Sequence, residues 1–324
     1  MKVPPSVQRW LTSAESDPSV RFRYWTEVRG RPANDPRARA ARRQIGRKGW
    51  AAWLLESQWP DGHWVTPQTS AGGLYRPKYA VTNWSAIVLG DLGMTRSDPR
   101  IRRTAELFFR VWTGKGWPLG PDGDEICVTG NIVRTLVRFG YLDHPVVRRS
   151  IDWIVRTQTK DGGWHCWYRY GTLDAWEGLA ALAEIPPPER SPAVARSIER
   201  GAEFYLDRAL MHEGPTPYPP WFRIHYPNHY YYDVLVGLRV LTRLGYGGDR
   251  RLGPALRWLK EKRRPDGRWS LDAAHPDLDL KLANYRPSDP VYALILELPG
   301  APSRWATVEA LSVLASVERA RNAG

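Results

Sequence analysis

Two pairs of polar residues at helical spacing are the strongest candidates for chemistry in this sequence. Asp174 and Glu177 are three residues apart, and His229 and Asp233 are four apart, in segments otherwise rich in apolar residues. Residues at these spacings share one face of a helix. A carboxylate packed against an apolar neighbour is costly, so we expect these side chains to face a cavity. There, burial would raise the pKa of at least one carboxyl group, as a general acid requires.

These considerations give five candidate catalytic residues. They are Asp174 as the first choice for the acid, Asp233 supported by His229 as the second, and Glu177 and Glu125. A plainer interpretation stays open, in which Asp174 and Asp233 start helices or make core hydrogen bonds. His229 and Asp233 could equally form only a local hydrogen bond between residues i and i+4.

Aromatic residues near these positions are candidates for lining a pocket. The candidate substrate-binding residues are Tyr79, Trp84, Trp176, Tyr232 and Trp305. Aromatic faces can stabilise a cationic intermediate, but aromatic rings also simply fill cores.

A metal site is a weaker alternative. Possible ligands that could converge at one end of the fold are Cys127, His165, Cys166, Asp174 and His229. The sequence contains no Cys-x2-Cys or His-x3-His spacing that would support zinc. We therefore predict no metal and no cofactor.

The elements that would position these residues are predicted to be helices. Asp17-Pro18, Asp35-Pro36, Asp98-Pro99, Ser191-Pro192 and, more weakly, His144-Pro145 each place an N-cap before a proline. We predict twelve helices, over 4–14, 17–29, 37–57, 80–93, 98–113, 125–140, 145–158, 172–185, 191–210, 228–245, 249–264 and 303–319. No long strand alternation occurs, although residues 291–298 are ambiguous.

A recurring tryptophan divides the helices into repeats. Asp-Gly-x-Trp ends at Trp64, Trp164 and Trp269, and weaker versions of the motif end at Trp117 and Trp221, so the spacing is about 51 residues. Such a helix pair cannot bury both of its faces alone, and neighbouring pairs must stack. Six pairs can close into a double ring. We expect these tryptophans to be buried and to lock each loop to the next helix.

The two sets of helices differ in character. Helices over 98–113, 145–158, 191–210 and 249–264 are arginine-rich on one face and should form an outer, solvated ring. Helices over 80–93, 125–140, 172–185, 228–245 and 303–319 are apolar nearly all round and should form the inner ring. The fold class is therefore all-α, an α6/α6 toroid, with residues 1–324 as one domain.

Composition excludes a disordered chain, a disulfide-based framework and a membrane-spanning helix. The chain has 324 residues, 17 Trp and only 2 Cys, with no apolar stretch of about 20 residues. Residues 1–10 lack the apolar region of a signal peptide, so we predict a cytoplasmic protein. The net charge of +13 comes from basic residues interleaved with acidic ones, which favours a solvated surface over nucleic-acid binding. Weak peripheral association with an anionic membrane stays open, and the oligomeric state is not assigned.

The repeats resemble a known superfamily. Gln58 to Trp64 and Gln158 to Trp164 look like the QW-type repeats of squalene–hopene cyclases, other class II terpene cyclases and protein prenyltransferase β subunits. Residues 125–185 look especially like one repeat of a squalene–hopene cyclase. The resemblance extends from about residue 35 to residue 316 and is strongest to stand-alone bacterial proteins of single-toroid size. It implies an α6/α6 toroid around an aromatic-lined cavity.

The catalytic motifs of these families do not transfer. The Asp-x-Asp-Asp acid of class II cyclases is absent; residues 122–125 come nearest but precede a different inner helix, and residues 277–279 are unconvincing. The Asp-x-Cys zinc ligands of prenyltransferases correspond to Asp174 and Trp176, so the thiolate is missing.

Two functions follow as hypotheses. The first is a toroid that acts on or binds a hydrophobic, isoprenoid-type ligand, with proton donation by a cavity carboxylate in a cyclase- or isomerase-like reaction. The second is a non-catalytic binding or interaction scaffold. We expect the site at the N-terminal ends of the inner helices, polar at its mouth and apolar in depth.

Overall fold

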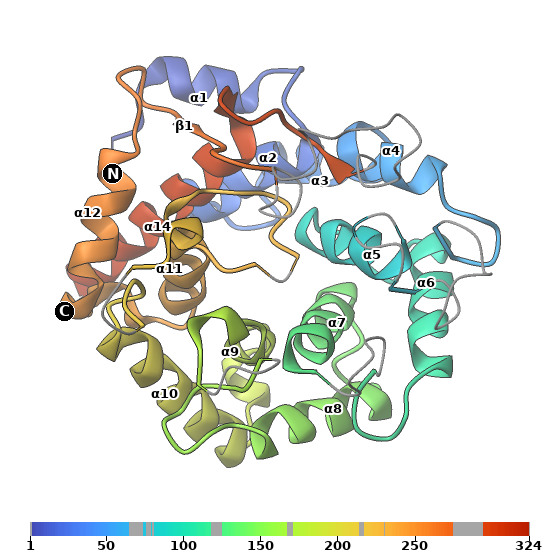
Figure 1. Cartoon of the computed structure of the whole chain (residues 1–324). Coiled ribbons are helices and arrows are strands. Elements are labelled where there is room, and N and C mark those ends of the chain that lie inside the picture. The colour runs from blue at the N-terminus through green and yellow to red at the C-terminus, as the bar shows by residue number, and fades with distance from the viewer. Residues whose placement is uncertain are drawn as a thin grey trace, which may run out of the picture.

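Helices arranged in two concentric rings make up this computed structural model, which describes residues 2–64, 74–75, 79, 81–117, 125–166, 171–213, 217–229, 231–274 and 294–323. Figure 1 looks down the ring and shows one set of helices around the centre with the other set outside it. The all-α toroid predicted from the sequence is confirmed. Within the described ranges, no helix is long and apolar enough to span a bilayer.

The outer ring is formed by α1 (Pro5–Thr12), α3 (Pro36–Arg42), α4 (Gly49–Glu56), α6 (Pro99–Arg110), α8 (Pro145–Arg156), α10 (Pro192–Asp207) and α12 (Gly253–Glu261). The inner ring is formed by α2 (Pro18–Arg23) with a π-helical turn η1 (Tyr24–Val28), α5 (Thr82–Asp91), α7 (Ile126–Phe139), α9 (Glu177–Ala183), α11 (Val234–Arg243) and α14 (Arg304–Ala323). The last helix, α14, packs against α2 and η1, which brings the two ends of the chain together.

Short elements fill the connections between the helices. The 3₁₀ turns are η3 (Leu173–Ala175), η4 (Pro187–Glu189), η5 (Pro219–Phe222), η6 (Tyr246–Gly248) and η7 (Arg250–Leu252). β1 (Trp269–Ser270) pairs antiparallel with β2 (Pro302–Ser303), with Trp269 opposite Ser303. This two-residue pairing agrees with the expectation of no sizeable sheet among the described residues.

The predicted helix starts are confirmed at atomic level. The side chains of Asp17, Asp35, Asp98 and Ser191 each accept a hydrogen bond from a backbone N–H in the first turn, and each is followed by proline. His144 does the same through Nδ1. These caps satisfy donors that a helix start leaves without an intrahelical partner.

Some helix boundaries differ from the prediction. The segment 37–57 is broken between α3 and α4, where Gly46 and Gly49 have φ of +80° and +71°. The segment 172–185 begins with a 3₁₀ turn. The segment 228–245 becomes helical only at Val234, because Asp233 caps that helix from an extended conformation. Residues 291–293 of the ambiguous segment lie outside the described residues.

The repeat tryptophans are buried, as expected, at 0–3% exposure. Four of the indole N–H groups donate to a backbone carbonyl near the C-terminal end of the preceding outer helix, at distances of 2.7–2.9 Å. The donor–acceptor pairs are Trp64–Leu54, Trp117–Phe108, Trp164–Ile154 and Trp269–Leu259. Each indole thus satisfies a helix-end carbonyl without an intrahelical partner while filling the gap between the rings.

Asp-Gly turns place these tryptophans. Gly62, Gly162 and Gly267 have φ of +99°, +93° and +85°, a region that residues with a Cβ seldom occupy. A Cβ on Gly162 would lie 2.3 Å from the carbonyl oxygen of Arg200. The turn therefore lies directly against the next outer helix.

Candidate functional site

A cavity of about 600 Å³ lies in the ring at the C-terminal ends of the inner helices. Its wall includes Asp91 at the end of α5, Arg138 near the end of α7, Glu184 just after α9 and Arg243 at the end of α11. We expected the site at the N-terminal ends of the inner helices, whereas this cavity lies at their C-terminal ends.

The long helix α14 forms one side of the cavity along most of its length. Trp305, Glu309, Ser312, Ser316 and Arg319 follow one another along a single face and all line the wall. At 1.5 Å per residue, the stripe is about 21 Å long, so the cavity extends well into the ring. Its volume is in the range of small-molecule sites, roughly 300–1,000 Å³.

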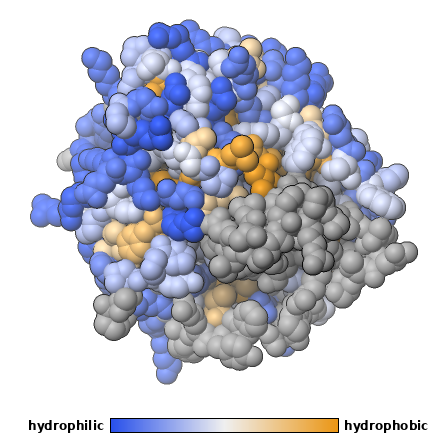
Figure 2. Space-filling model, turned by 45° about the horizontal axis from the view of Figure 1, so that its top comes forward, coloured by the Kyte–Doolittle hydropathy of each residue, from blue (hydrophilic) through white to orange (hydrophobic). Residues whose placement is uncertain are grey.

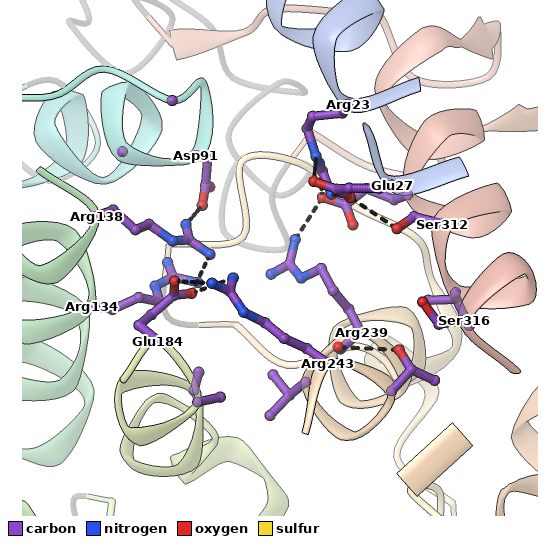
Figure 3. Close-up of a pocket in the computed structure, with 18 of the residues that line it drawn as sticks. Arg23, Glu27, Asp91, Arg134, Arg138, Glu184, Arg239, Arg243, Ser312 and Ser316 are labelled. Carbon is purple, nitrogen blue, oxygen red and sulfur yellow. Dashed lines mark hydrogen bonds and ion pairs between the residues drawn. The ribbon is translucent and has the colours of Figure 1, made fainter. Parts of the chain in front are cut away.

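Arginine and carboxylate side chains dominate the wall (Figure 3). The arginines are Arg23, Arg134, Arg138, Arg239, Arg243 and Arg319, and the carboxylates are Glu27, Asp91, Glu184 and Glu309. Apolar residues share the lining, among them Phe22, Leu92, Val137, Ala180, Ala183, Val240 and Val313. The expectation of an apolar interior does not hold for this cavity, because the inner helices carry charged residues toward their C-terminal ends.

One group of ion pairs joins α5, α7, α9 and α11. Arg138 contacts Asp91 and also Glu184, the latter at 2.7 Å. Arg243 contacts the same Glu184 at 2.6 Å. Burial would raise the pKa of Asp91 and Glu184, but the neighbouring arginines outweigh burial and lower both values. Both carboxylates therefore stay ionised near neutral pH.

A second group joins α2, η1, α11 and α14. Glu309 lies 2.5 Å from Arg23 and 2.9 Å from Arg239. Arg23 also forms a bidentate pair with Glu27, at 2.7 and 2.8 Å, and Ser312 donates to that carboxylate. Despite burial, the two arginines lower the pKa of Glu309 to about 2. The π-helical turn begins between Arg23 and Glu27, and such turns occur frequently at functional sites.

Arg134 is the buried arginine of this wall that pairs with no carboxylate in the described residues. It is only 1% exposed, and its guanidinium lies 4.8 Å from the ring centre of Trp176. Nη2 donates to Asn131, while Nε has no hydrogen-bond partner and no carboxylate in the described ranges pairs with it. Burial lowers its pKa to about 10, so it stays charged at neutral pH.

A second, water-sized void of about 10 Å³ lies deeper in the ring and shares Arg239, Trp305 and Glu309 with the large cavity. Asp233 and His225 also line it, with Nδ1 of His225 2.8 Å from Oδ2 of Asp233. The predicted His229–Asp233 pair is therefore wrong. The two residues are not on one helical turn, because α11 begins only at Val234, and the other oxygen of Asp233 caps that helix.

The remaining predicted catalytic residues lie away from the large cavity. Asp174 accepts a hydrogen bond of 2.7 Å from the indole of Trp221. Glu125 precedes α7 and accepts from the thiol of Cys127 at 3.3 Å. Glu177 is fully buried at the start of α9, and neither carboxyl oxygen has a hydrogen-bond partner in the described part of the chain. Burial raises the pKa of Glu177 well above its ordinary value.

The predicted aromatic residues fall into separate groups. Tyr79 and Trp84 pack around His229, with ring centres 5.5 and 5.0 Å away, and burial lowers the pKa of His229 to about 3. Tyr232 donates to the carbonyl of Leu210 at 2.9 Å. Trp305 is the predicted aromatic that lines the large cavity. The binding roles of all these residues stay predictions.

The possible metal ligands do not assemble a site among the described residues, where no group of three suitable side chains occurs. Cys127 and Cys166 are both free cysteines. A hydrogen bond with Cys166, together with burial, raises the pKa of the Cys127 thiol well above its ordinary value.

The arginines of this cavity were missed although the sequence holds a signal for them. Arg134 and Arg138, and likewise Arg239 and Arg243, are four residues apart on inner helices. Like charges at this spacing destabilise an isolated helix, so their presence on an otherwise apolar helix indicates that other elements supply partners.

Figure 2 shows hydrophilic residues over much of the described surface and hydrophobic ones near the middle of the face in view.

Comparison with known proteins agrees with the repeat pattern. Residues 121–204 match the family model of the squalene-hopene cyclase C-terminal domain. Over 129 residues the chain is 26% identical to a squalene–hopene cyclase from Bradyrhizobium diazoefficiens; the match covers 35% of this chain and 18% of that protein. The chain thus spans only a small part of that relative's length.

Two solved structures are similar over almost the whole chain. A protein from Actinoplanes has 16% identity and a TM-score of 0.46, with 98% of both chains covered. The type II terpene cyclase MstE from Scytonema has 18% identity and a TM-score of 0.46, with 96% of this chain and 90% of that chain covered. The sequence match at residues 121–204 confirms the resemblance to the terpene cyclase toroids that the repeats indicated.

Proposed function

We propose that this chain binds an amphiphilic, isoprenoid-type small molecule in the central cavity of its ring. The observation that carries the proposal is the cavity itself, which is about 600 Å³ in volume and mixes apolar and charged residues in its wall. A wall that carries both apolar and charged side chains suits a ligand with an apolar part and a charged part. The similarity of residues 121–204 to a squalene–hopene cyclase domain supports the isoprenoid class.

Native mass spectrometry of the purified protein, followed by lipid extraction, tests this proposal directly. A bound molecule should leave the protein when the cavity is filled by Ala183→Trp, because Ala183 lies in the wall. Ala193→Trp adds the same side chain at an exposed position of α10 and should keep the ligand. A wild-type protein that neither carries nor takes up any isoprenoid would refute the proposal.

Proton-donor catalysis is the second candidate function, and Glu177 is the residue that favours it. A buried carboxyl group whose pKa is raised keeps its proton to higher pH and can act as an acid. The ionised carboxylates of the cavity wall cannot take this role at neutral pH, because arginines lower their pKa values. We rank binding first because these carboxylates of the cavity wall do not supply a proton near neutral pH.

Asp174, Asp233, His229 and Glu125 remain proposed participants in that second function. Glu177→Gln should abolish turnover of a bound isoprenoid while leaving the ligand in place. If Glu177→Gln, Asp174→Asn and Asp233→Asn all turn over substrate at the wild-type rate in folded protein, the catalytic proposal fails. The non-catalytic binding scaffold would then remain.

A further inference from the structure

Two arginines that line the central cavity have hydrogen-bond donors without a partner in the described residues. Nε of Arg134 and Nη2 of Arg239 are buried and have no partner in the described residues. Both residues line the central cavity, from α7 and α11. A buried guanidinium donor without an acceptor is costly, so a partner from outside the chain would relieve it.

The favourable interaction of a cation with a helix C-terminus does not account for Arg134 or Arg239. Arg138 and Arg243 lie in the last turns of α7 and α11, where cations stabilise the C-terminal dipole, and they share Glu184. Arg134 and Arg239 lie one turn farther from those ends. Arg239 shares its only carboxylate in the described chain, Glu309, with Arg23.

The charge of the wall points to the kind of partner. Six arginines and four carboxylates line the cavity, so six minus four leaves an excess of two positive charges. The carboxylates Asp91, Glu184 and Glu309 have lowered pKa values. They therefore stay ionised near neutral pH, and the excess of two positive charges remains. A ligand with two negative charges would neutralise the wall.

We propose that Arg134 and Arg239 bind a phosphate-type dianion that forms the head group of the cavity ligand, which rests on the binding function proposed above. Guanidinium groups match phosphate oxygens in geometry and charge. Oδ2 of Asp91 and Oε2 of Glu309 also lack a partner. A bridging water can donate to these oxygens. The apolar part of the ligand then contacts residues such as Phe22 and Val313.

Calorimetric titration with geranyl monophosphate, geraniol and inorganic phosphate tests the proposal. Wild-type protein should bind geranyl monophosphate about 10- to 100-fold more tightly than geraniol, since charge-assisted hydrogen bonds are the strong ones. Inorganic phosphate should compete with geranyl monophosphate. Arg134→Met and Arg239→Met should each remove most of the preference for the phosphate.

Two further variants keep the result interpretable. Arg148→Met removes the same charge from the exposed pair with Glu189 on the outer ring and should leave binding unchanged. Arg134→Lys keeps the charge but loses the guanidinium fork, so it should weaken phosphate binding less than Arg134→Met. Thermal melting reports whether each variant is folded. If the methionine variants are unfolded, the preference of the wild-type protein for geranyl monophosphate over geraniol decides whether the phosphate site exists.

The outcomes separate the two proposals. Equal affinity for geranyl monophosphate and geraniol would overturn the phosphate site and leave isoprenoid binding intact. Binding of inorganic phosphate without either terpenoid would support the phosphate site and refute the isoprenoid function. Binding of none of the three probes would overturn both.

Discussion

Replacing Glu309 by glutamine should destabilise the protein by about 3 kcal/mol at pH 7. Glu309 is buried between Arg23 and Arg239, which lower its pKa from 4.5 to about 2. A shift of 2.5 units at 1.36 kcal/mol per unit gives about 3 kcal/mol. Glutamine has nearly the same shape but no charge, so this stabilisation is lost and two largely buried arginines lose their shared carboxylate.

The effect should depend on pH with a definite sign. The pKa of Glu309 is lower in the folded than in the unfolded state, so its contribution is complete above pH 4.5 and declines as the pH falls toward 2. Urea unfolding of wild type and Glu309→Gln at pH 7, 5, 4 and 3 measures it. The difference in unfolding free energy should be constant from pH 7 to 5 and shrink below that.

A surface carboxylate provides the matched control. Glu203 pairs with Arg251 on the outer ring, and both side chains are well exposed. Exposed pairs contribute only about 0–1 kcal/mol, so Glu203→Gln should change little. If Glu309→Gln is as stable as wild type, or if its deficit is the same at every pH, the ion-pair network does not stabilise the ring as inferred here.

Three further predictions concern stability. Trp164→Ala should cost about 3–5 kcal/mol in urea unfolding, because a fully buried ring and its bond to a helix end are lost; a cost below about 1 kcal/mol would contradict the packing role. Gly162→Ala should be more destabilising than Gly114→Ala by at least about 1 kcal/mol, since both have φ near +95° but only Gly162 has a backbone atom in the way; equal melting temperatures would contradict this. Glu177→Gln should gain stability relative to wild type as pH rises above 4.5, because the raised pKa of Glu177 makes its ionisation unfavourable in the folded state; a constant difference between pH 4 and 8 would refute the buried, protonated carboxyl.

The features that could be predicted from the sequence are those that depend on local residues. A capping side chain before a proline, as at Asp98 and Ser191, fixes a helix start through groups within three residues. The Asp-Gly-x-Trp turn likewise needs only a positive φ at glycine and a ring to bury. These local signals gave the double ring and most of its helix boundaries.

The cavity depends on residues far apart in the sequence. Glu309 meets Arg23 only because α14 returns to the first inner helix. Glu184, which follows α9, serves arginines from both α7 and α11. Single helices therefore could not reveal the partners of the arginines near their C-terminal ends, because the carboxylates that pair with these arginines come from other elements.

The tryptophan bonds of the repeats have a consequence for how such a ring can diversify. Each indole donates to a main-chain carbonyl, so the residue at the acceptor position, such as Leu54 or Ile154, can change without loss of the bond. These bonds also tie outer helices to loops and involve none of the side chains that line the cavity. One tryptophan in about fifty residues therefore keeps the shell closed, and the interior is free to acquire a different ligand by substitution alone.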